Sequence, residues 1–157
     1  MQTKWIRLLL VFLFVVFLEV CFFSSWSAMF RVDLFLGMVI GLAVFCPFSH
    51  GIAFVFVASV LMQAFSGVAT GGFALVYVFS FIFLDMIKDV IYLENVPPQC
   101  VLGFLLYVMI FFVLSFMTGN PLNRGTISSV LLGAVFTGMT TPLMVRLVSC
   151  VWGADER

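Results

Sequence analysis

The chain has 157 residues, of which 64% are hydrophobic and only 9% are charged, and its mean hydropathy is +1.29. A soluble domain carries roughly 25% charged residues, so this sequence cannot supply the polar surface of a soluble fold. It predicts an integral membrane protein, solvated by lipid. The formal net charge is zero, which argues against a basic surface for nucleic acid.

Hydrophobic runs separated by turn residues predict about six transmembrane helices. They cover residues 5–23, 33–46, 51–65, 71–87, 99–117 and 127–151. The second and third segments are shorter than the roughly 20 apolar residues that a spanning helix needs. They are two short tilted spans, which we favour, or the arms of a re-entrant hairpin turning at residues 47–50. The loops are short, so we expect one all-α domain over residues 1–157, folded as a compact bundle.

The orientation of the segments follows from the basic residues in the loops, which gather on the cytoplasmic side. If the N-terminus lies inside, five basic residues fall on the inner side and two on the outer side. The inner residues are Lys4, Arg7, Lys88, Arg146 and Arg157, and the outer residues are Arg31 and Arg124. We therefore expect both termini on the cytoplasmic side of the membrane.

Charged side chains near the first loop need a reason, because charge inside a membrane segment is costly. Glu19 is either an intramembrane carboxylate for ion or substrate binding, or an interfacial group that pairs with Arg31; we favour the second. Asp33 fits the N-cap or first turn of the second segment, where the helix dipole favours an acid. These three residues are expected to have structural roles.

Three more charged residues share one helix face at the inner end of the fourth segment. Asp85, Lys88 and Asp89 are three and four positions apart. They could bind a cation, form a solvated helix end with an internal ion pair, or offer a docking patch to a cytoplasmic partner. Gln63, deep in the third segment, is expected to hydrogen-bond across helices.

Small residues predict close contacts between helices. Gly37 and Gly41 form a G-x-x-x-G pair on the second segment, and such pairs let two backbones approach. On the sixth segment a stripe of small residues with a period of four is expected to be a packing seam. Its members are Ser129, Gly133, Thr137 and Thr141.

Catalysis and cofactor binding find no support in the sequence. The four cysteines lie far apart, and His50 is the one histidine, so the spacing of a metal or redox site is missing. No nucleophile lies beside a histidine base, and no glycine-rich phosphate loop is present. We expect a protein that is not an enzyme and has no cofactor.

Residues 30–75 resemble the rod shape-determining protein MreD family. In that family Arg-Pro-Asp or Arg-Pro-Asn opens the second segment, and Arg31 and Asp33 match its ends. Pro47 falls at the following turn, and Ser66-Gly67 closes the third segment. Two positions depart from the family: Val32 replaces the proline, and Gln63 replaces an aspartate.

The resemblance implies a non-enzymatic membrane adaptor of the bacterial elongation machinery, which serves rod shape and peptidoglycan synthesis. Such a protein binds the single-span protein MreC and, through it, MreB and the RodA–transpeptidase synthase. The Gly37/Gly41 face would suit MreC, and the Asp85/Lys88/Asp89 end would suit a cytoplasmic partner. The fold is expected to be similar to substrate-binding subunits of energy-coupling-factor transporters. That similarity supplies the alternative function, a binding subunit of a small-molecule importer.

Overall fold

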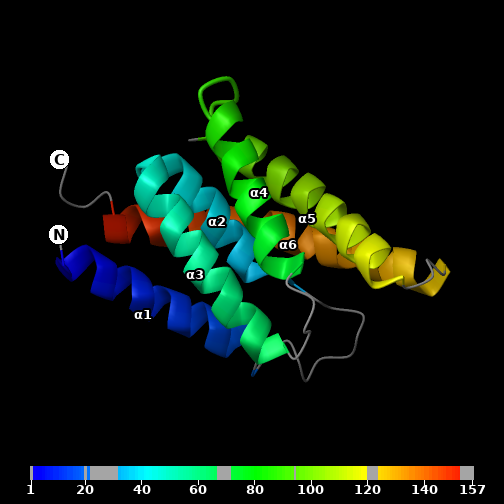
Figure 1. The fold of residues 1–157 in the computed structure, drawn as a ribbon. Coiled ribbons are helices and arrows are strands. Elements are labelled where there is room, and N and C mark those ends of the chain that lie inside the picture. Colours follow the sequence, from blue (N-terminus) through cyan, green and yellow to red (C-terminus); the bar gives the residue numbers. More distant parts are fainter. Residues whose placement is uncertain are drawn as a thin grey trace.

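The computed structural model describes residues 2–19, 21, 32–66, 72–93, 95–119 and 124–152, and this part of the chain is all-helical (Figure 1). Its helices are α1 (Gln2–Leu18), α2 (Leu34–Phe45), α3 (Phe48–Ser66), α4 (Gly72–Ile87), α5 (Val96–Thr118) and α6 (Arg124–Trp152). These helices lie where the six segments were expected, with ends within three residues except at the end of the first. There α1 ends at Leu18, and residues 20, 22 and 23 of the expected segment lie outside the described residues.

Local sequence explains several helix ends. α2 ends at Phe45, and its C-cap Cys46 is extended, because a residue directly before proline is disfavoured in the helical conformation. Pro97 and Pro98 lie in the first turn of α5, where their missing N–H groups cost little. α5 ends at Gly119, whose φ of 66° is left-handed and suits glycine.

α2 is the central helix of the bundle. It contacts all five other helices, and every residue from position 34 to position 43 is buried. It has only 12 residues, which is about 18 Å of helix. This length is short of the roughly 30 Å hydrocarbon core of a bilayer, and the burial of residues 34–43 places α2 inside the bundle for most of its length.

A close contact joins α2 to α6 through two glycines. A Cβ on Gly37 would lie 3.3 Å from Thr141 Cα, and a Cβ on Gly41 would lie 3.2 Å from Val145 Cα. Both pairs are 104 residues apart in the sequence, so the two helices run parallel in register. The G-x-x-x-G pair of α2 and the small-residue stripe of α6 therefore meet each other.

α5 packs on another side of α6 through a second pair of glycines. A Cβ on Gly103 would clash with Thr141 Oγ1, and one on Gly138 would lie 2.7 Å from the carbonyl oxygen of Cys100. Thr141 is therefore enclosed between α2 and α5, and it is fully buried. Close backbone approach is the usual way in which helices associate where water supplies no driving force.

Aromatic rings join three helices at the end of the bundle where both termini lie (Figure 1). The ring centroid of Trp5 in α1 is 5.6 Å from that of His50 in α3 and 5.7 Å from that of Trp152 in α6. The start of α1, the start of α3 and the end of α6 therefore lie at one end.

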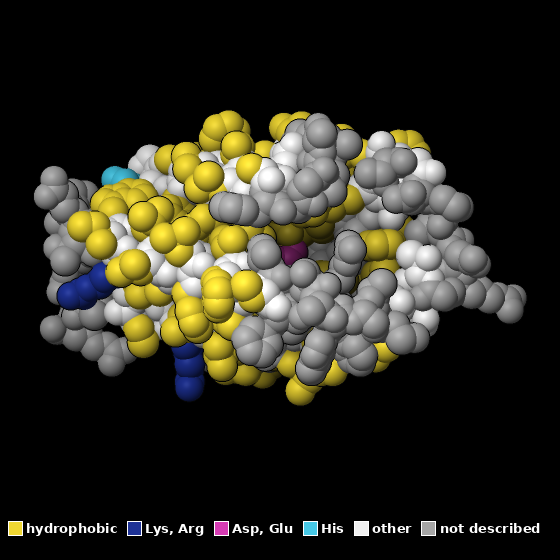
Figure 2. Space-filling view, turned by 90° about the horizontal axis from the view of Figure 1, so that it is seen from below, with side chains coloured by type: hydrophobic (Ala, Val, Ile, Leu, Met, Phe, Trp, Pro, Cys, Tyr) yellow, Lys and Arg dark blue, Asp and Glu magenta, His cyan; other side chains and the backbone are white. Residues whose placement is uncertain are grey.

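Large apolar side chains cover much of the outside of the bundle, as the face in Figure 2 shows. The exposed members on α5 and α6 include Leu105, Met109, Phe112, Phe116, Leu131, Val135, Met139 and Leu143. Two helices of the described part are long and apolar enough to cross a membrane, over Val96–Met117 and Thr126–Trp152. The other four apolar helices are shorter by this measure.

The α2–α6 contact predicts that Gly41→Leu destabilises the protein. The new side chain would meet Val145 and Val148, and overpacking of this kind costs about 1–3 kcal/mol. Thermal unfolding in detergent should show a lower midpoint. Ala64→Leu adds the same side chain at an exposed position of α3 and should leave the midpoint nearly unchanged. Equal effects of the two substitutions would contradict the contact.

Candidate functional site

α2 begins inside the bundle, where its first backbone N–H groups need hydrogen-bond acceptors. Leu34 and Phe35 are buried, with 4% and 0% of their surface exposed. The first N–H groups of a helix have no acceptor within the helix, and an unpaired buried N–H group is costly. Acceptors must therefore come from other side chains.

Two carboxylates supply these acceptors. Asp33 is the N-cap of α2, and its Oδ1 accepts a hydrogen bond from Leu36 N at 2.8 Å. Glu19, directly after α1, reaches across with Oε1 and accepts from Phe35 N at 3.0 Å. Negative groups at this position also interact favourably with the helix dipole. The end of α1 is thereby fixed to the start of α2.

Hydroxyl groups from α4 and α6 complete the site. The Tyr77 hydroxyl donates to Asp33 Oδ2, and Thr137 Oγ1 accepts from Asp33 N at 3.0 Å. Tyr77 is 3% exposed and packs its ring against Phe35, with centroids 4.9 Å apart. Four helices, α1, α2, α4 and α6, therefore meet around Asp33.

The arrangement has an electrostatic cost. Glu19 and Asp33 are both half-buried and are close enough to interact. Two neighbouring carboxylates repel when both are charged. Hydrogen bonds from two backbone N–H groups and one hydroxyl offset this repulsion, because bonds to a charged acceptor are stronger than neutral ones. Within the described residues, every buried side-chain nitrogen or oxygen has a hydrogen-bond partner.

The carboxylates thus serve the backbone of α2 rather than an open cavity. Among the described residues, no three His, Cys, Asp or Glu side chains are grouped so that they could hold a metal ion. The expected N-cap role of Asp33 is confirmed. The expected pairing of Glu19 with Arg31 lies outside the described residues.

The expected partner face at Gly37 and Gly41 needs correction. Both glycines are buried, and Met144 and Val148 of α6 fill the space in front of them. A second protein cannot reach this face while α6 occupies it. The close helix approach that the glycines predicted does occur, but its partner is a helix of the same chain.

The charged end of α4 holds the internal ion pair. Lys88 Nζ lies 2.7 Å from Asp85 Oδ1, and both side chains are partly exposed. Asp89 is exposed at the same end. Gln63 is half-buried on α3. The docking patch therefore remains a hypothesis, and Asp89 is its most exposed residue.

The four residues of the predicted packing seam on α6 differ in how deeply they are buried. Thr137 and Thr141 are fully buried, where they contact the N-terminus of α2 and Gly103. Gly133 is buried and Ser129 half-buried. The second half of the stripe is the part that meets α2.

Tyr77 is the residue that the sequence reasoning missed. A tyrosine within an apolar segment carries a hydroxyl that needs a partner when it is buried, and this was the available signal. The signal does not name the partner, because Asp33 lies 44 residues away and only the fold brings the two together.

The fold and this site define an all-helical protein with an acidic helix cap inside its bundle and two helices able to cross a membrane. Comparisons with protein-family models, curated proteins and solved structures found no significant match.

The capping role of Glu19 predicts different outcomes for two substitutions. Glu19→Gln keeps an acceptor for Phe35 N and should leave the unfolding midpoint in detergent close to that of the unmodified protein. Glu19→Leu leaves this N–H unpaired and should cost about 1–3 kcal/mol. A site for a cation or a charged substrate would instead make both changes equally harmful to binding, with little effect of either on the midpoint.

Proposed function

We propose that the chain is a multi-pass protein of the bacterial cytoplasmic membrane, with six crossings and both termini in the cytoplasm. The apolar outer surface supports a lipid environment, because soluble monomers rarely expose apolar patches larger than a few hundred Å². The Trp5–His50–Trp152 cluster supports an even number of crossings, since it holds the first helix and the last helix end together. The short α2 fits a bilayer because neighbouring helices surround it.

Within that membrane we infer a non-enzymatic adaptor of the cell-elongation machinery. The observation that carries this inference is the use of Glu19, Asp33 and Tyr77, which hold the start of α2 in place. These polar groups bond to the α2 backbone and to one another, and this supports a structural use. The adaptor would bind MreC and, through it, MreB and the RodA–transpeptidase synthase.

The resemblance to MreD gains a physical meaning from the fold. The residues that carry it include Asp33, which caps the central helix, and Pro47, which separates α2 from α3. A motif at these positions specifies how the bundle is built. It says nothing directly about which outer surface a partner contacts, and the surfaces that remain are apolar helix sides and the exposed end near Asp89.

The proposed topology predicts which positions a membrane-impermeant thiol reagent can reach in intact cells. In a variant whose four cysteines are replaced by serine, Arg124→Cys should react from outside, because position 124 begins α6 and would lie on the outer side of the membrane. Lys88→Cys should react only after the membrane is opened. The reverse labelling would contradict the orientation, and labelling of both from outside would contradict the six crossings.

The adaptor role predicts that the tagged full chain, purified from native membranes in mild detergent, carries a single-span protein that mass spectrometry identifies as MreC. If the α4 end contributes, Asp89→Lys should weaken this copurification. Arg146→Glu reverses an exposed charge on α6 and serves as the matched control.

Two results would count against this proposal. Copurification of a tightly held small molecule without a single-span protein would favour the importer subunit. Retention of MreC by Asp89→Lys, with the same yield as the control, would remove the α4 end from the interface.

A further inference from the structure

The turn between α4 and α5, residues 88–93, has a fixed shape and projects from the bundle. Figure 1 shows it at the top of the view, beyond the neighbouring helices. The N–H groups of Val90 and Ile91 both donate to the carbonyl oxygen of Ile87, at 3.0 and 2.9 Å. At the other end, the carbonyl oxygen of Leu93 accepts from the buried side-chain Nε2 of Gln99 at 2.7 Å. A surface held in this way loses little conformational entropy when it binds.

Large apolar side chains at this turn face outward. Met86, in the last turn of α4, is 75% exposed, Val90 is 78% exposed and Tyr92 is 81% exposed. Leu93, directly after Tyr92, is buried. The three exposed side chains contribute little packing to this chain and are available to another molecule.

The same segment is acidic. Between positions 85 and 94 the sequence has three acids, Asp85, Asp89 and Glu94, against one base, Lys88. Lys88 Nζ is already held by Asp85 Oδ1 at 2.7 Å. Asp89 is exposed directly before Val90. The turn therefore combines exposed apolar side chains with an excess of negative charge.

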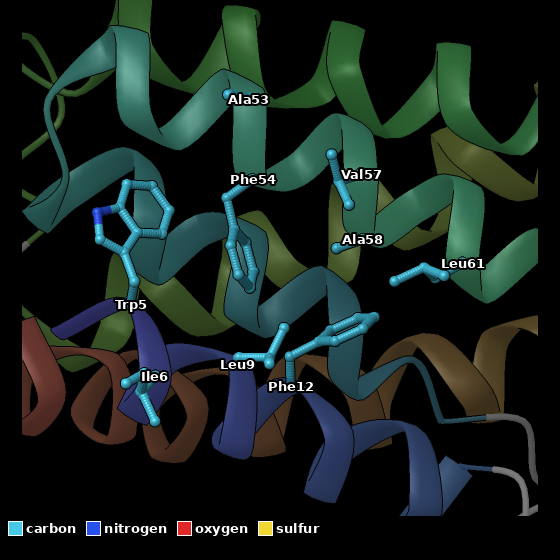
Figure 3. A pocket seen from close by; sticks show the side chains of 9 residues that line it. All are labelled: Trp5, Ile6, Leu9, Phe12, Ala53, Phe54, Val57, Ala58 and Leu61. Atoms are coloured by element: carbon cyan, nitrogen blue, oxygen red, sulfur yellow. The ribbon is translucent and has the colours of Figure 1, made fainter. Parts of the chain in front are cut away.

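The apolar groove between α1 and α3 lacks such charge. Figure 3 shows its lining, which runs from Trp5 to Phe12 on α1 and from Ala53 to Leu61 on α3 and consists of apolar and aromatic side chains. An uncharged lining does not distinguish lipid from protein. The α4–α5 turn is the surface whose charge makes that distinction.

The negative charge decides among three occupants of the turn. The cytoplasmic leaflet of a membrane is itself negative and attracts basic segments, so an acidic turn is repelled from it. The turn of a second copy carries the same charge and is repelled as well. A protein segment that combines Lys or Arg with apolar side chains complements both the charge and the exposed Met86, Val90 and Tyr92.

Single-span membrane proteins contain a segment of this kind. Basic residues gather where a spanning helix leaves the membrane on its cytoplasmic side, and the apolar residues of the span follow directly. In the topology proposed above, the α4–α5 turn lies on the same side. The turn and such a flank therefore meet at one level when a spanning helix packs beside the bundle.

We propose that the α4–α5 turn docks the basic cytoplasmic flank of a single-span partner. Asp89 pairs with Lys or Arg of the flank, and Met86, Val90 and Tyr92 pack against its apolar side chains. This docking surface rests on the adaptor function proposed above and specifies which part of the partner the chain holds.

A benzophenone amino acid in place of Tyr92 tests the contact in native membranes. After irradiation, the tagged full chain is purified and mass spectrometry locates the crosslink. The crosslink should join position 92 to the single-span partner, within the Lys- and Arg-rich residues beside its span. The same amino acid in place of Phe116, which is 90% exposed at the other end of α5, is the matched control and should give no crosslink to that flank.

An exchange of charge tests the pairing. Asp89→Lys should lower the yield of copurified partner about tenfold, because like charges then face each other. Replacing the partner's basic residues at the crosslink by Glu should lower the yield with the unmodified chain and restore it with Asp89→Lys. Asp89 is exposed, so Asp89→Lys should leave the unfolding midpoint in detergent unchanged.

The outcomes separate failure of the docking surface from failure of the adaptor role. Crosslinks from position 92 to lipid or to a second copy would overturn the docking surface alone. A copurifying single-span protein would also overturn it if position 92 does not crosslink to its basic flank, or if the exchange of charge does not restore its yield. The absence of any copurifying single-span protein would contradict the adaptor role and the docking surface together.

Discussion

The parallel contact of α2 with α6 is the constraint on which the rest of the bundle depends. Gly37 and Gly41 have no side chains, so the α2 backbone can lie against Thr141 and Val145. In hydrocarbon, association relies on close packing and on hydrogen bonds, because water supplies no hydrophobic force between helices. Glycines that let two backbones approach therefore favour such a contact. It places α2 in the centre, where the other helices can surround it.

This central position explains the acids. A helix that starts among buried side chains cannot hydrogen-bond its first N–H groups to water, so Glu19 and Asp33 accept from them. The Tyr77 hydroxyl then donates to the second carboxylate oxygen of Asp33, and Thr137 Oγ1 accepts from the Asp33 N–H group. The same register that brings Gly37 to Thr141 also brings Asp33 to Thr137, one turn earlier on each helix. Packing and polar capping are two parts of a single α2–α6 interface.

The sequence predicted the helices well and their partners poorly. Apolar runs and turn residues such as Pro47 mark helix ends locally, and this is why the segments agree. The G-x-x-x-G pair predicted a close approach, but no local feature says whether the approaching helix belongs to the same chain. Arg31, across the first loop, was the expected partner of Glu19, whereas the acceptor role of Glu19 toward Phe35 depends on where α1 ends in space. Tyr77 joined the site only through the tertiary fold.

The uneven attachment of the helices indicates where the protein can interact with its surroundings. α2, α5 and α6 are joined by glycines at backbone distance, while α1 contacts α6 and α2 but leaves a groove beside α3. Elements with fewer packed contacts open at lower cost. The Glu19 bond to Phe35 fixes the far end of α1, and the rings of Trp5, His50 and Trp152 fix its near end. Between these two anchors the groove leaves α1 with fewer packed contacts than the core around α2.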